Sequence, residues 1–124
     1  MPARRTVFFI SDRTGITAEM LGNSLLTQFE DFQFRRITVP FIDSPEKVED
    51  VIRQVNETGV AEGRRPIVFS SVVDEVASET IRARAEALTL DLFQIFIAPL
   101  EAELTAKSSH AAGRSHGIAN SHEY

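Results

Sequence analysis

The sequence of 124 residues contains no cysteine. This absence excludes disulfide bonds, thiolate metal sites, cysteine nucleophiles and the phosphatase chemistry that runs through a cysteine–arginine loop. Long apolar runs are also missing, and none approaches the roughly 20 residues that a membrane-spanning helix needs. Near the amino terminus, Asp12 and Arg13 interrupt the apolar core that a secretory signal requires. We therefore expect a cytoplasmic protein without a membrane partner.

Basic charge is in short supply, because 13 lysines and arginines stand against 18 aspartates and glutamates, which gives a formal net charge of −5. A nucleic-acid partner calls for a basic face, so none is expected as the main partner. The three histidines, His110, His116 and His122, repeat at intervals of six, and neighbours at that spacing do not share a helix face. No carboxylate cluster accompanies them, and no metal site is expected.

The best-known glycine-rich phosphate loops are absent as well. Gly59 and Gly63, like Gly113 and Gly117, are four apart, but no Gly-Lys-Ser or Gly-Lys-Thr follows, so there is no Walker-type loop. A dinucleotide fingerprint needs three glycines after the first strand, where Gly15 stands alone. A phosphorylated receiver domain would carry an acidic residue after its third strand, where this chain has serines.

What the chain does contain is an alternation of apolar runs and helical patterns. Strands are predicted at residues 7–10, 34–39, 67–69 (with a continuation to 73 left open) and 92–97. Candidate amino-terminal caps precede the helices, namely Asp12 or Thr14, then Ser44 before Pro45, then Asp74. Gly59 should end the second helix and leave 60–65 as a polar loop, and a short helix should follow Pro99. The first helix is expected to bury a stripe made of Ile16, Met20, Leu21, Leu25, Leu26 and Phe29.

Three successive strand–helix units with apolar strands indicate a mostly parallel sheet covered on both faces. The predicted fold is a three-layer α/β domain over residues 1–106, with an open sheet of about four strands in the order 2-1-3-4 and helices on both faces. Residues 107–124 are rich in glycine, serine and histidine and hold one aliphatic residue larger than alanine, Ile118, so they cannot fold alone. We interpret them as a segment that leads to a further, carboxyl-terminal half.

The predicted strand order places one candidate site. Ligands of open parallel sheets collect at the carboxyl ends of the strands where the order reverses, here between the first and third strands. Hydroxyls and a helix amino terminus with its dipole would converge there on a phosphate or carboxylate. The residues concerned are Ser11, Asp12, Thr14 and Gly15 after the first strand, and Ser70 and Ser71 after the third. The alternative interpretation is a well-capped turn in which the serines merely end a strand.

A second candidate is the stretch Gly113-Arg114-Ser115-His116-Gly117, with His110 just before it. Arginine offers a planar fork to a phosphate or carboxylate, and histidine adds a hydrogen bond or a proton. The flanking glycines permit a close approach of the backbone.

Four motifs in order resemble those of the bacterial phosphoenolpyruvate synthase regulatory proteins and, more distantly, the regulators of pyruvate, phosphate dikinase. They are ISDRTGITAE at 10–19, VFSSVVD at 68–74, LDLFQ at 90–94 and HAAGRSHG at 110–117. The resemblance covers essentially the whole chain, and the last motif favours the synthase branch. Members of this family are about twice as long, with a phosphate-binding loop in the second half that this sequence lacks.

The resemblance implies a bifunctional enzyme. It phosphorylates a threonine of phosphoenolpyruvate synthase, or of the dikinase, with ADP as the donor, which inactivates the target. It removes that phosphate with inorganic phosphate and releases pyrophosphate. The residues named after the first and third strands, together with Thr17, would then bind phosphate or the target's phosphothreonine loop. Arg114, Ser115 and His116 would face the missing half or the target. No catalytic residue is assigned to this chain, which is expected to be inactive alone, and a homodimer is left open.

Two other functions compete with this one. The first is a module that docks the target enzyme and has no chemistry of its own. The second is a nucleotide-binding α/β domain unrelated to the family.

Overall fold

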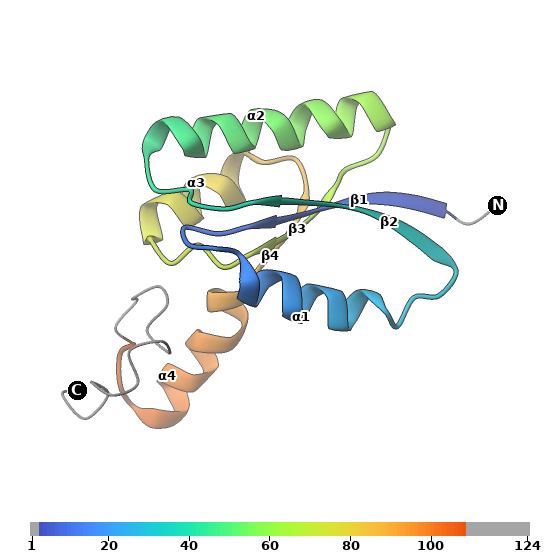
Figure 1. The fold of residues 1–124 in the computed structure, drawn as a ribbon. Coiled ribbons are helices and arrows are strands. Elements are labelled where there is room, and N and C mark those ends of the chain that lie inside the picture. Colours follow the sequence, from blue (N-terminus) through green and yellow to red (C-terminus); the bar gives the residue numbers. More distant parts are fainter. Residues whose placement is uncertain (1–2, 109–124) are drawn as a thin grey trace.

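The computed structural model describes residues 3–108, which form a four-stranded sheet and its helices. The strands are β1 (Ala3–Ile10), β2 (Phe32–Val39), β3 (Ile67–Ser70) and β4 (Leu88–Asp91), all parallel, in the order β2-β1-β3-β4 (Figure 1). The helices are α1 (Ile16–Leu26), α2 (Pro45–Glu62), α3 (Glu75–Arg84) and α4 (Ala98–Leu104), with a short π-helix, η1 (Phe93–Ile97), before the last. The predicted fold class and strand order are confirmed. Within residues 3–108, none of the helices combines the length and the apolar character needed to cross a bilayer.

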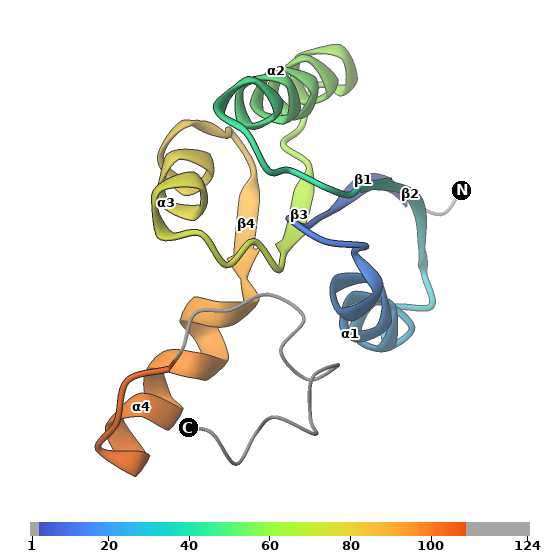
Figure 2. The same ribbon diagram turned by 60° about the vertical axis from the view of Figure 1, so that its left-hand side comes forward.

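The sheet separates two apolar cores. Helices α2 and α3 cover one face and α1 lies on the other (Figures 1 and 2). Side chains alternate along β1, so Phe8 and Ile10 pack toward α2 while Val7 and Phe9 pack toward α1. All four are at most 1% exposed. This burial on both faces is what the continuous apolar run predicted.

Helix α1 packs against the sheet through small residues. Ala18, Gly22 and Leu26 are buried, and a Cβ added at Gly22 would lie 2.5 Å from Cε1 of Phe9. The Phe9 ring stacks on Phe69 at a centroid distance of 5.8 Å and fills the space that larger helix residues would need.

The stripe predicted for this helix is therefore largely wrong. Only Leu26 is buried and Leu21 half-buried, whereas four of its residues are exposed, namely Ile16, Met20, Leu25 and Phe29. The aromatic pair beneath the helix selects a different, small-residue face.

Helix α2 begins as predicted and ends later. Ser44 caps it by accepting a 3.2 Å hydrogen bond from the Lys47 N–H, and Pro45 is its first residue. The helix runs past Gly59 to Glu62, so the loop predicted at 60–65 is wrong over its first three residues. Gly63 ends the helix instead. Its φ of 74° is left-handed, the conformation in which a glycine commonly terminates a helix.

The fourth strand is shifted from its predicted place. The prediction put it at 92–97, but β4 spans Leu88–Asp91 and residues 93–97 are helical. Helix α3, capped by Asp74 as predicted, stops at Arg84, and extended backbone at Ala85 brings the chain to the sheet early. The Asp91 carboxylate then accepts a 3.2 Å hydrogen bond from the Gln94 N–H, which starts a helical turn where the strand ends.

The predicted domain boundary at residue 106 falls two residues before the end of the described residues. Almost all of the segment 107–124 lies outside them, so the division stays a prediction.

Candidate functional site

The ends of β1 and β3 lie side by side at the carboxyl edge of the sheet. Ile10 is paired with Ser70, and the Ser71 N–H donates a 2.9 Å hydrogen bond to the Ile10 carbonyl. The loops that follow, 11–15 and 71–74, therefore meet at the point where the strand order reverses. This is the location that the sequence predicted for a ligand.

Two of the serines at this edge are turned inward. Ser11 is 3% exposed and its Oγ accepts a 3.0 Å hydrogen bond from the Arg13 N–H. Ser70 is 2% exposed and its Oγ accepts one of 3.3 Å from the Val72 N–H. Each serine stabilises the turn that follows its own strand. Their hydroxyls hold the loops in place and are not presented at the surface.

Asp12 connects the two loops. Its Oδ2 accepts hydrogen bonds of 2.9 Å from the Val73 N–H and 3.4 Å from the Asp74 N–H. The prediction that Asp12 caps α1 is wrong, because its carboxylate lies at the start of α3. Asp74 occupies the same helix end and accepts a 2.9 Å hydrogen bond from the Ala77 N–H. Asp12 and Asp74 thus accept hydrogen bonds from the Val73, Asp74 and Ala77 amides around this helix start.

The start of α1 is arranged differently. Gly15 precedes the helix with a left-handed φ of 87°, and it makes no side-chain cap. Thr14, the other predicted cap, accepts a long hydrogen bond of 3.5 Å from the Ile16 N–H. Thr14 and Thr17 are exposed, while Gly15 is buried against Thr38. Two exposed threonines therefore stand on either side of the point where α1 begins.

A hollow with several carboxylates in its lining lies between the starts of α2 and α3. Its lining includes Asp12, Asp43, Glu49 and Asp74. A hydrogen bond from Arg84 lowers the pKa of Glu49, so this carboxylate stays ionised near neutral pH. The carboxylates of this lining disfavour an anion in the hollow.

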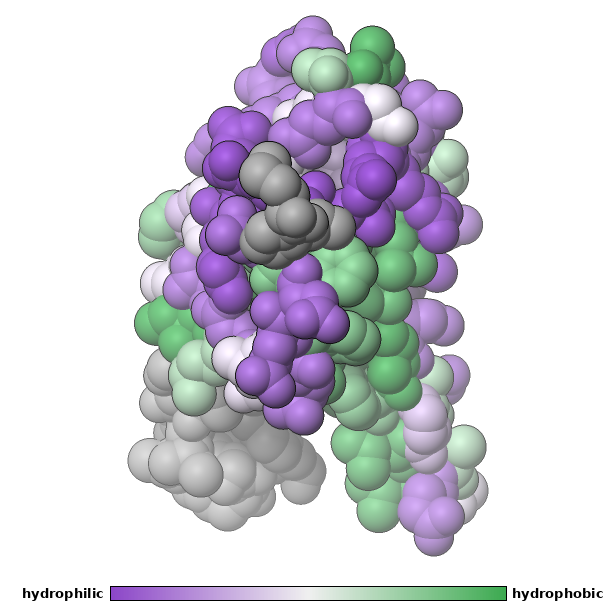
Figure 3. All heavy atoms as spheres, turned by 90° about the vertical axis from the view of Figure 1, so that its right-hand side faces the viewer, coloured by the Kyte–Doolittle hydropathy of each residue, from purple (hydrophilic) through white to green (hydrophobic). Residues whose placement is uncertain are grey.

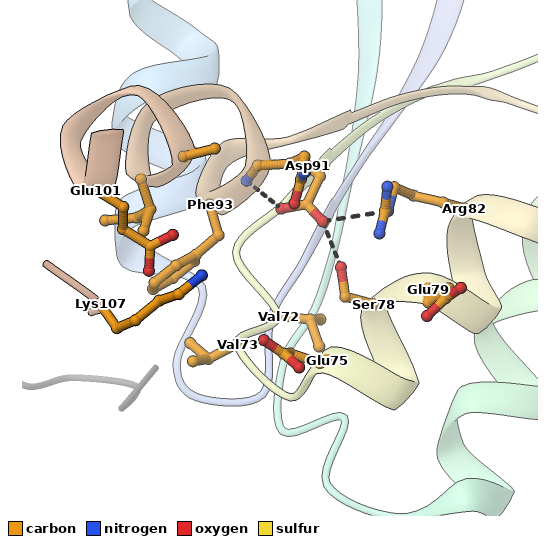
Figure 4. A pocket seen from close by; sticks show the side chains of 13 residues that line it. Val72, Val73, Glu75, Ser78, Glu79, Arg82, Asp91, Phe93, Glu101 and Lys107 are labelled. Atoms are coloured by element: carbon orange, nitrogen blue, oxygen red, sulfur yellow. Dashed lines mark hydrogen bonds and ion pairs between the residues drawn. The ribbon is translucent and has the colours of Figure 1, made fainter. Parts of the chain in front are cut away.

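A buried carboxylate that the sequence analysis did not single out lies at the tip of β4. Asp91 is 5% exposed and accepts hydrogen bonds from the Ser78 hydroxyl and the Gln94 N–H, and the Arg82 Nε lies 3.5 Å from its Oδ2 (Figure 4). The sequence does hold a sign of this buried carboxylate, because Asp91 is an acidic residue inside the apolar run 90–93. Asp91 ties α3 to the junction of β4 and η1, beside a hollow of about 230 Å³ that Lys107 also lines.

Of the remaining predicted site residues, one lies in the part of the chain that the structure describes and the others do not. Ser71 is half-buried beside Ile10, and whether it contacts a ligand stays a prediction. The residues of the second predicted site all lie outside the described residues, namely His110, Gly113, Arg114, Ser115, His116 and Gly117. Among the described residues, no group of three or more histidine and acidic side chains is placed to hold a metal ion.

Comparison with known proteins gives a consistent result. The sequence model of the kinase/pyrophosphorylase family matches residues 7–124. A protein of Legionella pneumophila (strain Corby) is 50% identical over 121 residues, which are 98% of this chain and 44% of that protein. One of Aromatoleum aromaticum is 55% identical over 120 residues, 97% of this chain and 43% of that protein. One of Burkholderia mallei (strain SAVP1) is 53% identical over 119 residues, 96% of this chain and 43% of that protein.

All three relatives carry the name phosphoenolpyruvate synthase regulatory protein. The resemblance that the four motifs indicated is confirmed. The chain spans less than half the length of these relatives.

Proposed function

The chain belongs to the kinase/pyrophosphorylase family, and on this premise we propose that it forms part of a regulator of phosphoenolpyruvate synthase. The observation that carries the proposal is the match over residues 7–124, which includes both loops at the carboxyl edge of the sheet. The names of the relatives support the synthase as the target.

The proposed reaction has two directions. In the first, the hydroxyl oxygen of a target threonine attacks the β-phosphorus of ADP, the bond to the bridging oxygen breaks, and AMP leaves while the hydroxyl proton is lost. In the second, an oxygen of inorganic phosphate attacks the phosphothreonine phosphorus and the bond from that phosphorus to the threonine oxygen breaks. The threonine oxygen takes up a proton and becomes the hydroxyl again, and the newly formed pyrophosphate is released. Catalysis of such transfers depends mainly on positioning and on stabilising charge on the phosphoryl oxygens.

In this scheme the start of α1 binds a phosphoryl group. The amides of the first turn, the helix dipole and the exposed hydroxyls of Thr14 and Thr17 offer donors to its oxygens. Gly15 supplies the left-handed backbone conformation, with a φ of 87°, that leads into the helix. Ser11 and Asp12 hold the loop in shape through the hydrogen bonds described above.

The nucleotide is assigned elsewhere. The sequence has no Walker-type loop, so ADP is expected to bind in the additional polypeptide that the longer relatives carry. This chain alone would then be inactive.

The test uses the complete polypeptide with purified phosphoenolpyruvate synthase. With ADP, mass spectrometry should detect one phosphothreonine on the synthase together with loss of synthase activity, and added phosphate should reverse both and release pyrophosphate. Replacing Thr14 and Thr17 by valine should slow phosphorolysis at least about tenfold, whereas Thr58→Ala, a helix hydroxyl bonded to its own backbone on α2, should not. Tight binding of the synthase without any transfer would replace the proposal with the docking module.

A further inference from the structure

One side of the molecule carries apolar side chains that the described residues leave uncovered. Helices α2 and α3 both cover one face of the sheet, but on the other face α1 stands alone and contacts β1 and β3. At β4 this second face stays open, and Leu88, which points to it, is 39% exposed. Sheets of parallel strands are normally covered on both faces, so a layer is missing beside α1.

One wall of this open region is a flank of α1. Glu19 and Asn23 lie on the flank toward β2, since Glu19 accepts a hydrogen bond from Thr38 and Asn23 accepts one of 2.7 Å from Arg36. At 3.6 residues per turn, Leu21 and Leu25 lie on the opposite flank, toward β4. Leu25 is 45% exposed and Leu21 half-buried.

The other wall is formed by η1 and α4, which project below the sheet on the same side as α1 (Figures 1 and 2). Phe93, Ile97 and Glu101 face the hollow beside α3. Ile95 and Phe96 of η1 do not line that hollow and are 45% and 50% exposed. In Figure 3 an apolar green surface continues from the middle of the molecule down to the lobe that α4 forms.

Large apolar patches on the surface of a folded protein mark contact surfaces. We propose that this apolar surface, made by Leu25 of α1, Leu88 of β4 and Ile95 and Phe96 of η1, is covered by the additional polypeptide of the longer family members, within the same molecule. The Legionella relative has more than half of its length outside the match, since the matched part is 44% of it. Residues 109–124 supply only Ile118 and Tyr124 as large apolar side chains, which is too little to cover the surface.

Covalent connection favours an intramolecular partner over a second copy, because it keeps the covering segment at a high effective concentration. An interface between halves of one chain can also be as apolar as a core, which suits leucine, isoleucine and phenylalanine. Leu25 lies in the last turn of α1, so the covered surface would begin at the end of this helix that is opposite to the proposed phosphoryl site.

The test is thiol labelling in the complete polypeptide. Leu25→Cys and Phe96→Cys are compared with Val60→Cys, an 81% exposed control on α2, and the labelled peptides are identified by mass spectrometry. The first two should react at least about tenfold more slowly than the control, with rates that do not depend on protein concentration. Hydroxyl-radical footprinting of Leu25 and Phe96 in the unsubstituted protein should show the same protection and does not depend on the variants folding.

Equal labelling and equal oxidation at all three positions would overturn the proposal. Protection that grows with protein concentration would overturn it as well, in favour of a second copy. Neither thiol labelling nor footprinting requires phosphoryl transfer. A result against the covered surface can therefore be told apart from a result against the proposed function.

Discussion

The carboxylate of Asp12 reaches from the loop after β1 to the Val73 N–H at the start of α3, over a distance of 2.9 Å. This hydrogen bond joins two loops that are 61 residues apart in the chain. Val73 comes just before Asp74, the cap of α3, so the hydrogen bond holds the first loop against the segment that leads into that helix. The starts of α1 and α3 differ, because Asp74 caps α3 with its side chain whereas α1 has no side-chain cap.

Removing this connection should weaken the fold. Asp12→Ala leaves the Val73 and Asp74 amides without their acceptor and should lower the free energy of unfolding by about 1–3 kcal/mol. Asp12→Asn keeps an oxygen acceptor and should lose less. Urea unfolding measures both, and Asp31→Ala, at an exposed position, is the control. Equal stability of Asp12→Ala and the unchanged protein would show that the loops hold together without this contact.

Gly22→Ala should destabilise the protein although alanine is the better helix former. The added methyl would lie 2.5 Å from Phe9 and 3.0 Å from Phe69, so the helix or the aromatic pair must shift. Overpacking of this kind typically lowers the free energy of unfolding by about 1–3 kcal/mol. Ser24→Ala, exposed on the same helix, should be neutral or slightly stabilising. A rise in Tm for both variants would contradict the close packing described here.

Asp91→Ala should be among the more damaging single substitutions. It strips the Ser78 hydroxyl and the Gln94 N–H of their acceptor in a buried setting, at a loss of about 2–4 kcal/mol. The Arg82 contribution is small because that side chain is 40% exposed. A double-mutant cycle with Ser78→Ala should give a coupling above about 0.5 kcal/mol. Additive effects would mean that the two side chains act independently.

The ion pair between Glu49 and Arg84 predicts a pH dependence. The hydrogen bond from Arg84 lowers the pKa of Glu49 in the folded state. Its stabilising effect is therefore present above the unfolded pKa and is lost as the pH falls through the folded pKa. Carboxyl NMR should show Glu49 titrating below the ordinary range of glutamate, and Arg84→Gln should move it back up. A titration at or above the ordinary value would contradict the pairing.

The strand order, the buried β1 and the caps at Ser44 and Asp74 could all be predicted from the sequence, because apolar runs and cap residues act locally. The buried face of α1 could not, since the space that Phe9 and Phe69 leave decides it. The position of β4 could not be predicted either. Its register depends on where α3 stops, and the apolar run at 92–97 suits a helix as well as a strand.

The candidate site was predicted in position and only partly in composition. Adjacent loops follow from strand order, but burial of a serine side chain does not. The sequence could not show that Ser11 and Ser70 turn inward to their own backbone, or that Asp12 crosses to the other loop. Both depend on the exact approach of β1 and β3.

The most direct test of the account is an amide NMR titration of the complete polypeptide with inorganic phosphate and with pyrophosphate. We predict saturable shifts of the Gly15, Ile16 and Thr17 amides at the start of α1, with Gly63, at the far end of α2, unmoved. Absence of saturable shifts at these three amides, or shifts confined to other parts of the chain, would contradict a phosphoryl-binding role for this site.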